Sequence, residues 1–172
     1  MSDTGWKSPG TMESISDYGV PWSNPNNAKT SDNSYTVNGG GSADGSDILK
    51  ASNFGFNIPT GATIDGVIIS VERHGTNNIS IYTLNQIGYD IDLPIPSEDA
   101  YASFGSESEL WDQELTPAIV NDSDFYMSAS SAGDNSGDWE AYIDHIQMKV
   151  YYTETETPTI GTRYPLPAFK RP

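Results

Sequence analysis

The clearest alternation of apolar and polar positions lies in residues 141–153, AYIDHIQMKVYYT. Every second residue across 146–152 is apolar, so these side chains are predicted to face a core. His145 has the opposite parity and is predicted to face outward. This pattern is typical of a half-buried strand in an antiparallel sheet.

Two further runs rich in Ile, Val and Tyr predict strands. Residues 62–73 begin after the turn signal at residues 59–61 and end at His74-Gly75. Residues 78–91 are too long for one straight strand, and Gly88 is predicted to bend or bulge it.

Helical signals are confined to one short turn. Thr116 is a suitable N-cap and Pro117 suits the first helical position. Many short strands separated by turn residues predict an all-β fold, an antiparallel β-sandwich or jelly roll with extended N- and C-terminal arms. We expect an N-terminal arm at 1–16, mobile over about its first ten residues, the sandwich at 17–153 and a Pro-rich basic arm at 154–172.

Residues 17–36, DYGVPWSNPNNAKTSDNSYT, show neither a helical period nor strand alternation, yet they contain Tyr18, Trp22 and Tyr35. Turn formers fix the path of this segment, and a disordered leader is usually poor in aromatic residues. We therefore expect an ordered strap, anchored in the core by Trp22, that crosses a sheet edge and protects it from aggregation.

The C-terminal segment has a different charge from the rest of the chain. Residues 157–172 carry +3 within a total of −16, so the remainder carries −19. Prolines favour an extended chain there, and aromatic residues argue against plain disorder. We expect this arm to dock on a neighbouring subunit, with Trp6 and Lys7 as a smaller N-terminal counterpart. The predicted attachment residues are Trp6, Arg163, Tyr164, Leu166, Phe169, Lys170 and Arg171.

The strong negative charge makes nucleic acid and anionic membrane surfaces poor partners. The chain has no cysteine, which excludes disulfides and cysteine-based zinc sites. The first ten residues lack a signal-peptide pattern, and no apolar run has the length of a membrane span.

The sequence contains no recognisable catalytic, metal-binding or cofactor-binding motif. His74 and His145 are the only histidines, and no nucleophile, P-loop or dinucleotide motif accompanies them. Asp44 with Asp47, and residues 134–138, are acidic loops that do not match a calcium-binding pattern. We therefore expect no catalytic residue, no metal site and no cofactor. Exposed aromatics could stack on sugars, although in a sandwich they more often form core.

Three groups of residues follow one another along the chain. They are Trp22, Asn24, Pro25, Asn27, Ala28, Ser31, Asp32 and Tyr35, then Phe54, Gly55, Phe56, Ile58, Pro59, Gly61, Ala62, Ile64, Gly66, Val71, Glu72 and Arg73, and finally Leu110, Trp111, Thr116 and Phe125. Together they resemble a jelly-roll-like domain of virion structural proteins in tailed bacteriophages and prophages, over residues 22–153. Asp112 departs from this pattern, since a small residue or glycine is usual after the Leu-Trp pair.

The resemblance implies a non-enzymatic domain on a virion, and we favour a capsid decoration protein on the outer surface of the head. Its expected partners are the major capsid protein, neighbouring virion proteins and further copies of itself, with a trimer favoured. A tail-associated, receptor- or glycan-binding module is the alternative, and a carbohydrate-active enzyme is the third possibility. The residues expected to form the core and the strap are Trp22, Tyr35, Phe54, Phe56, Ile64, Trp111 and Val150.

Overall fold

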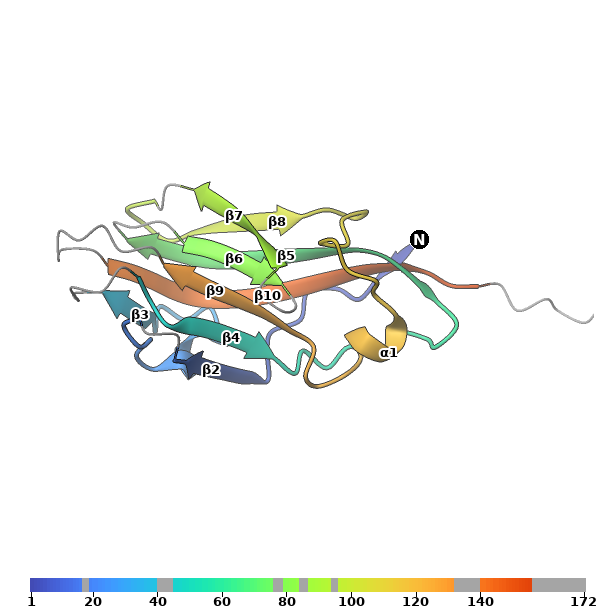
Figure 1. The fold of residues 1–172 in the computed structure, drawn as a ribbon, viewed down its shortest axis with the longest axis horizontal. Coiled ribbons are helices and arrows are strands. Elements are labelled where there is room, and N and C mark those ends of the chain that lie inside the picture. Colours follow the sequence, from blue (N-terminus) through green and yellow to red (C-terminus); the bar gives the residue numbers. More distant parts are fainter. Residues whose placement is uncertain are drawn as a thin grey trace, which may run out of the picture.

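The computed structural model is a sandwich of two antiparallel β-sheets (Figure 1). It describes residues 1–16, 19–39, 45–75, 96–131 and 140–155 in full, and the backbone alone at 79–83 and 87–93. The predicted all-β fold is therefore confirmed. Within these ranges, no helix is long and apolar enough to cross a membrane.

Sheet A is built around the two longest strands of the chain. Its backbone order is β1-β10-β5-β8, and β3 pairs with a second stretch of β10. The strands are β1 (Ser2–Asp3), β3 (Thr36–Gly39), β5 (Thr63–Gly75), β8 (Ala100–Gly105) and β10 (Glu140–Thr153).

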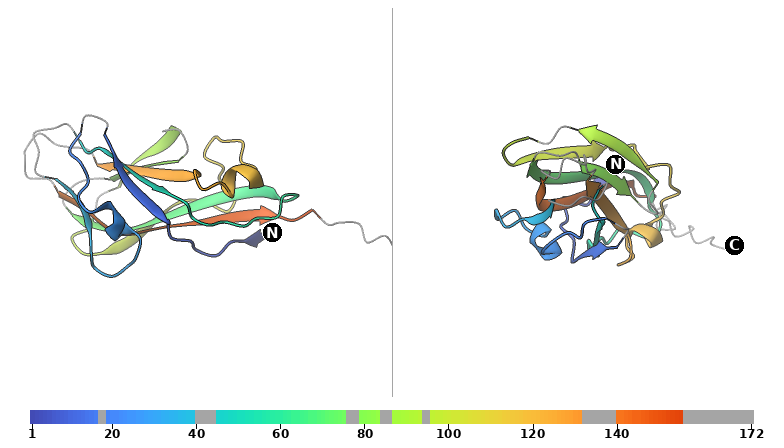
Figure 2. Two further views of the ribbon diagram at one scale, coloured as in Figure 1. Left: turned by 90° about the horizontal axis from the view of Figure 1, so that it is seen from below. Right: turned by 60° about the vertical axis from the view of Figure 1, so that its left-hand side comes forward.

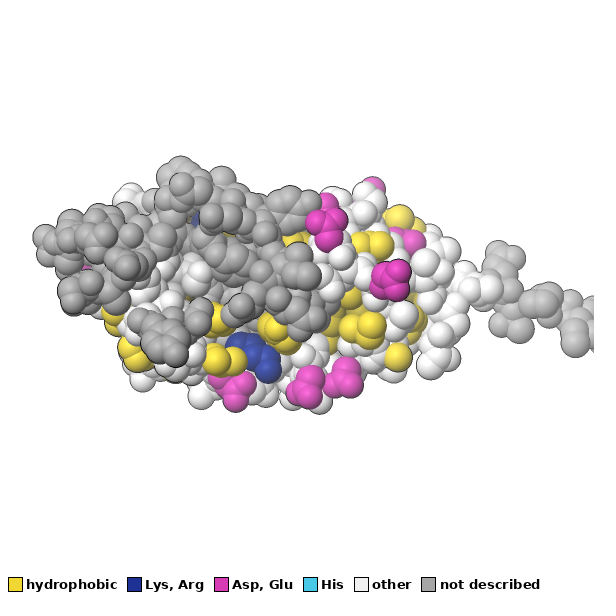
Figure 3. Space-filling model, viewed as in Figure 1, with side chains coloured by type: hydrophobic (Ala, Val, Ile, Leu, Met, Phe, Trp, Pro, Cys, Tyr) yellow, Lys and Arg dark blue, Asp and Glu magenta, His cyan; other side chains and the backbone are white. Residues whose placement is uncertain are grey.

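Sheet B packs on the opposite side of the core and has the order β2-β4-β9-β6-β7. Figure 3 views the molecule from the side of sheet B, and the acidic side chains visible there are spread out among apolar and uncharged ones. The strands are β2 (Thr11–Ile15), β4 (Ile48–Ser52), β6 (Ile79–Thr83), β7 (Ile87–Leu93) and β9 (Tyr126–Ser131).

Alternation along β5 and β10 places one parity of each strand in the core. Ile146 pairs with Val71 and Met148 with Ile69, and all four side chains are fully buried. Sheet B contributes buried Leu49, among others, from the facing side. The strand predicted at 141–153 and its inward face are thus confirmed.

The first 39 residues seal the outer edge of β10, where we expected an N-terminal arm. β1 pairs with Tyr151 and Tyr152, and Lys7 exchanges two backbone hydrogen bonds with Met148. Lys29 bridges to His145, and β3 pairs with residues 140–143. Figure 2 shows the N-terminus beside the end of β10.

The expectation of an N-terminal arm at 1–16, mobile over its first ten or so residues, is therefore wrong, because backbone hydrogen bonds pair these residues with both sheets. β2 adds a full strand to sheet B, in register with β4 from Thr11↔Ser52 to Ile15↔Ile48. The expected edge-covering strap is present, and its 3-10 turn η1 (Pro25–Ala28) lies between Ser23 and the bridge at Lys29.

The single bent strand predicted at 78–91 is also wrong. β6 and β7 form an antiparallel hairpin in which Gly88 pairs with Tyr82. Both strands are short runs rich in Ile and Tyr that follow closely on one another, so the sequence pattern alone did not separate them from one long strand.

The remaining local predictions describe turns, and the structure contains them. Gly55 adopts φ +66, and the rings of Phe54 and Phe56 stack at a centroid distance of 5.7 Å. The amide of Ala62 donates to the carbonyl of Pro59 and closes the turn into β5.

Thr116 caps the N-terminus of helix α1 (Pro117–Val120), and its hydroxyl accepts a hydrogen bond from the Ile119 amide at 3.3 Å. Asp112, at the position where the resemblance favours glycine, has φ +54. The left-handed backbone there explains why a residue without a side chain is suitable.

Candidate functional site

The outer face of sheet A, away from sheet B, gathers tyrosines, histidines and carboxylates in two adjacent rows. The register aligns Tyr101 of β8 with Glu72 of β5, and Glu72 with His145 of β10. One row further, His74 aligns with Tyr142. We call this surface the tyrosine–carboxylate patch; its residues are Tyr35, Glu72, His74, Asp99, Tyr101, Tyr142, Asp144 and His145.

Three rings pack tightly in the row at His74. The imidazole of His74 stacks on the Tyr142 ring, with centroids 4.5 Å apart and planes 6° from parallel. Tyr35, from the strap, meets both rings edge-on at 4.8 and 5.8 Å. The edge-to-face geometry suits the charge distribution of aromatic rings, so it fixes the strap against the sheet.

Asp99 joins this ring cluster through both of its oxygens. The Tyr35 hydroxyl donates to Oδ2 at 2.6 Å, and Nδ1 of His74 lies 2.7 Å from Oδ1. Partial burial raises the pKa of Asp99, but these hydrogen bonds outweigh it and hold the pKa below its ordinary value. The same bond, followed by burial and nearby carboxylates, raises the pKa of Tyr35 to about 12.

The other row links the strap and the N-terminal segment to β8. Nδ1 of His145 lies 2.9 Å from the Tyr101 hydroxyl, and its Nε2 lies 2.8 Å from the Ser8 hydroxyl. His145 is only 9% exposed, and burial lowers its pKa. Its predicted outward direction is correct, but the segments that seal the β10 edge cover it.

Two carboxylates accompany these groups: Glu72, which belongs to the row itself, and Asp144, which precedes His145 on β10. Asp144 is 1% exposed and accepts a hydrogen bond from the Asp32 amide at 3.3 Å. Burial raises its pKa, backbone hydrogen bonds oppose that shift, and Glu72 and Asp99 raise it further by repulsion. One buried oxygen of Glu72 has no hydrogen-bond partner.

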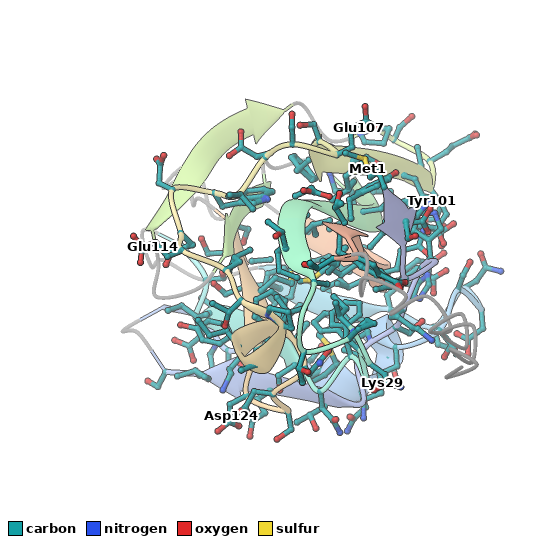
Figure 4. All side chains as sticks on the ribbon, turned by 90° about the vertical axis from the view of Figure 1, so that its right-hand side faces the viewer. Met1, Lys29, Tyr101, Glu107, Glu114 and Asp124 are labelled. Atoms are coloured by element: carbon teal, nitrogen blue, oxygen red, sulfur yellow. The ribbon has the colours of Figure 1, made fainter. Side chains whose placement is uncertain are left out.

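The patch therefore has a surplus of negative charge. In the part of the chain that the structure describes, the one ion pair on it is His74–Asp99, and no lysine or arginine pairs with Glu72, Asp99 or Asp144. Lys29, whose backbone bridges to His145, lies on the same side of the molecule as Tyr101 (Figure 4). The ring of Tyr101 remains accessible, since the residue is 46% exposed.

Ser8 and His145 have the separation of a nucleophile and its base. The partner at the other imidazole nitrogen is the Tyr101 phenol, which can either donate or accept a proton. A neutral imidazole has one N–H, so its two contacts hold Ser8 and Tyr101 together whichever tautomer is present. What this chain of groups does within the fold is join the N-terminal segment to β8.

Six of the seven residues proposed for core and strap are buried, and the seventh lies in the patch. Trp22 is 3% exposed and its indole nitrogen donates to the Asp47 carbonyl at 2.8 Å; Trp111 donates in the same way to Val67. Tyr35 is only partly buried, because its ring packs on the outer face of sheet A. The other buried members are Phe54, Phe56, Ile64 and Val150.

Of the proposed attachment residues, the structure describes Trp6. It is 40% exposed, and Nζ of Lys149 lies 4.8 Å from its ring centroid. Arg163, Tyr164, Leu166, Phe169, Lys170 and Arg171 lie outside the described residues, as do Tyr18, Asp44 and residues 134–138.

Asp47, considered for calcium, is buried and accepts a hydrogen bond from the Gly19 amide at 3.1 Å. Its carboxylate thus holds the backbone of the strap in place at Gly19. The described ranges contain no group of three or more potential metal-ligating side chains.

Sequence reasoning missed Asp99, Tyr101 and Tyr142 as members of a site. The parity of Tyr101 and Tyr142 on their strands was readable, but their meeting depends on the register of β8 and β10 with β5, and Asp99 lies just before β8. His74 and Tyr142 occupy the outer parity of two strands, and that shared parity was the available signal.

Neither a protein-family model nor a curated protein matches the sequence. Among solved structures, the chain is similar to the second N-terminal cellulose-binding domain of β-1,4-glucanase C from Cellulomonas fimi, with a TM-score of 0.39 and 15% sequence identity. The match covers 87% of this chain and 88% of that one. A likeness this distant supports no statement about ligand or function.

Proposed function

We propose that this chain is a non-enzymatic structural protein of a tailed-phage virion, carried as a decoration protein on the outer surface of the head. The observation that carries the proposal is the role of the residues behind the resemblance. Trp22, Phe54 and Trp111 fill the core, and Gly66 lets two backbones meet. These residues build a scaffold, as a structural domain requires, instead of converging on one reaction centre.

The edge protection of sheet A further supports a role in a crowded assembly. An open edge of β10 would offer its backbone groups to any neighbouring chain. Here β1, Lys7, Lys29 and β3 occupy that edge in turn. Contacts between copies, or with the major capsid protein, would then use side-chain surfaces instead of unintended strand pairing.

Particle fractionation tests the proposal. Virions produced by induction of the phage or prophage that encodes the chain are separated into heads and tails, and the chain is quantified in each fraction by mass spectrometry. We expect many copies per head and depletion from tails. Presence in tails alone would favour the tail-associated alternative, and absence from both fractions would overturn a virion role.

One observation favours the second candidate, a glycan-binding module. Tyr101 exposes 46% of its surface next to the carboxylate of Glu72 and the imidazole of His145, and such a combination suits a sugar ring with its hydroxyls. A glycan array probed with the full chain and with Tyr101→Ser tests this candidate, which predicts binding that the substitution removes.

A further inference from the structure

The proposed function leaves open which surface of the sandwich receives a neighbouring copy. We infer that the tyrosine–carboxylate patch is the docking surface for residues 157–172 of a second copy of this chain. This inference rests on the proposed multi-copy role and adds the surface and its occupant.

Charge complementarity is the first argument. The patch carries Glu72 and Asp99, which reach its surface, and Asp144, which is buried, and no lysine or arginine of the described residues pairs with them. Residues 157–172 carry three basic residues and no acidic one. The strongest concentration of positive charge in the chain thus matches a surface where carboxylates repel one another.

The aromatic character of the patch is the second argument. Prolines at 158, 165, 167 and 172 favour a polyproline-like chain, and aromatic-lined surfaces bind such chains at low entropic cost. Tyr101 presents an exposed ring, and Tyr35 and Tyr142 present partly buried ones. Their rings are held in place by Asp99, His145 and Glu140, so little side-chain freedom is lost on binding.

A peptide fits the patch better than a sugar does. A neutral glycan would leave the negative charge of Glu72 uncompensated, and an acidic glycan would be repelled. A cationic peptide satisfies both the carboxylates and the exposed ring.

The position of the segment favours a second copy over the same copy. Tyr142 lies near the start of β10 and Thr153 at its end, 11 residues or roughly 36 Å away at the rise of a strand. A tail that starts beyond Thr153 must reverse direction and span most of the sandwich to reach its own patch. A segment from a neighbouring copy is not tethered at this Thr153 and is free of that constraint.

Complementation between two variants of the full chain tests the inference. The patch variant is Tyr101→Ser with Asp99→Asn, and the tail variant replaces Arg163, Lys170 and Arg171 with Gln. Analytical ultracentrifugation at low salt should show association of the wild type, at least tenfold weaker association of each variant alone, and recovered pairing when the two are mixed. Higher salt should weaken the wild-type contact.

Ile119→Ser is the matched control, since Ile119 is 42% exposed on α1 and lies outside the patch. Circular dichroism confirms that each variant keeps its β signal. A photo-crosslinker at Tyr164, in a mixture of isotopically heavy and light chains, should link heavy to light chains at the strands of the patch.

Three results would overturn the inference: a wild type that stays monomeric at low salt, crosslinks confined to single chains, or glycan binding lost in the patch variant and kept in the tail variant. Head localisation is measured separately on particles. A chain found on heads without this contact would refute the docking surface alone, and a chain absent from virions would refute the proposed function.

Discussion

At the scale of single residues, buried aromatic side chains with satisfied polar atoms account for the irregular N-terminal segment. Trp22 has almost no exposed surface, and its indole N–H reaches the carbonyl of Asp47. One side chain therefore connects the strap, the core and the start of β4.

Replacing Trp22 with Ala should lower the free energy of unfolding by about 3–5 kcal/mol, because a large buried side chain is lost and a cavity remains. Denaturant unfolding measures the change. Trp6→Ala is the control, since Trp6 is 40% exposed, and it should cost less than about 1 kcal/mol. Equal losses in the two variants would mean that Trp22 is no anchor.

Gly66 is required by a close approach of two backbones. A Cβ atom at this position would lie 2.3 Å from the carbonyl carbon of Glu107, and backbone cannot move aside as a flexible side chain can. Gly66→Ala should therefore cost about 1–3 kcal/mol. Gly61, in the turn before β5, has nothing within 4 Å of the same atom, so Gly61→Ala should leave stability unchanged or raise it by up to about 1 kcal/mol. Thermal melts of both variants decide, and a Gly66→Ala protein as stable as the Gly61→Ala protein would contradict the argument.

At the scale of elements, hydrogen bonds that join different strands set the titration of the patch. Asp99 connects the strap to β5 through Tyr35 and His74. Because its pKa is lowered in the folded chain, its contribution to stability is present above its ordinary pKa and is lost as the pH falls through the lower folded value. The pKa of Tyr35 is raised, so its contribution is present below pH 10 and is lost as the pH rises through about 12.

Asp99→Asn should bring the pKa of Tyr35 down from about 12 toward its ordinary value, because the charged acceptor is removed. Ultraviolet absorbance of ionised tyrosine follows this titration, and Tyr35→Phe identifies the signal by deleting it. Asp124→Asn, a carboxylate on the loop before β9, is the control and should leave the titration unchanged. An unaltered high-pH transition in Asp99→Asn would contradict the Tyr35–Asp99 hydrogen bond as its cause.

Deletion of residues 1–8 should destabilise the sandwich by about 2–6 kcal/mol. It removes the hydrogen bond from the Thr4 amide to the Val150 carbonyl, both backbone hydrogen bonds between Lys7 and Met148, and the Ser8–His145 contact. Each of these contributes about 0.5–1.5 kcal/mol. Chemical denaturation measures the loss. A deleted chain as stable as the full one would restore the view of this segment as an arm.

The sequence predicted strands well where apolar and polar side chains alternate. It predicted them poorly where a short segment with few buried side chains joins a sheet through backbone hydrogen bonds. β5 and β10 carry a strong apolar period, and α1 carries its cap and proline. β1 has two exposed residues, and β2 buries only Met12, so neither gives a periodic signal. The patch needed register as well as parity, and a single sequence does not specify which strands are neighbours.

At the scale of the whole molecule, net charge would govern how copies meet. With −19 on the rest of the chain, identical bodies repel at short range, and the repulsion falls with salt. In the docking contact that we propose, the positive charge of the C-terminal segment would offset this repulsion.

Deleting residues 157–172 should leave the β signal in circular dichroism intact and abolish rebinding to particles stripped of the native chain. The last strand of the described residues ends at Thr153, so none of the described strands is lost, while all three C-terminal cations are. Deleting the same residues and adding a neutral Gly/Ser segment of equal length controls for length alone. Wild-type occupancy by the truncated chain would place attachment on the sandwich itself.

The sealed edge of β10 also has a consequence for synthesis. Ser2 pairs with Tyr152, and β3 with the start of the same strand, so the first and last strands of sheet A are hydrogen-bonded neighbours. Contacts between such distant residues are slow to form and await the entire strand. On the ribosome, the N-terminal segment would emerge long before its partner, and its backbone groups would wait in water until β10 is released. The domain would then close in a single late event, with the protection of its edge as the final step of folding.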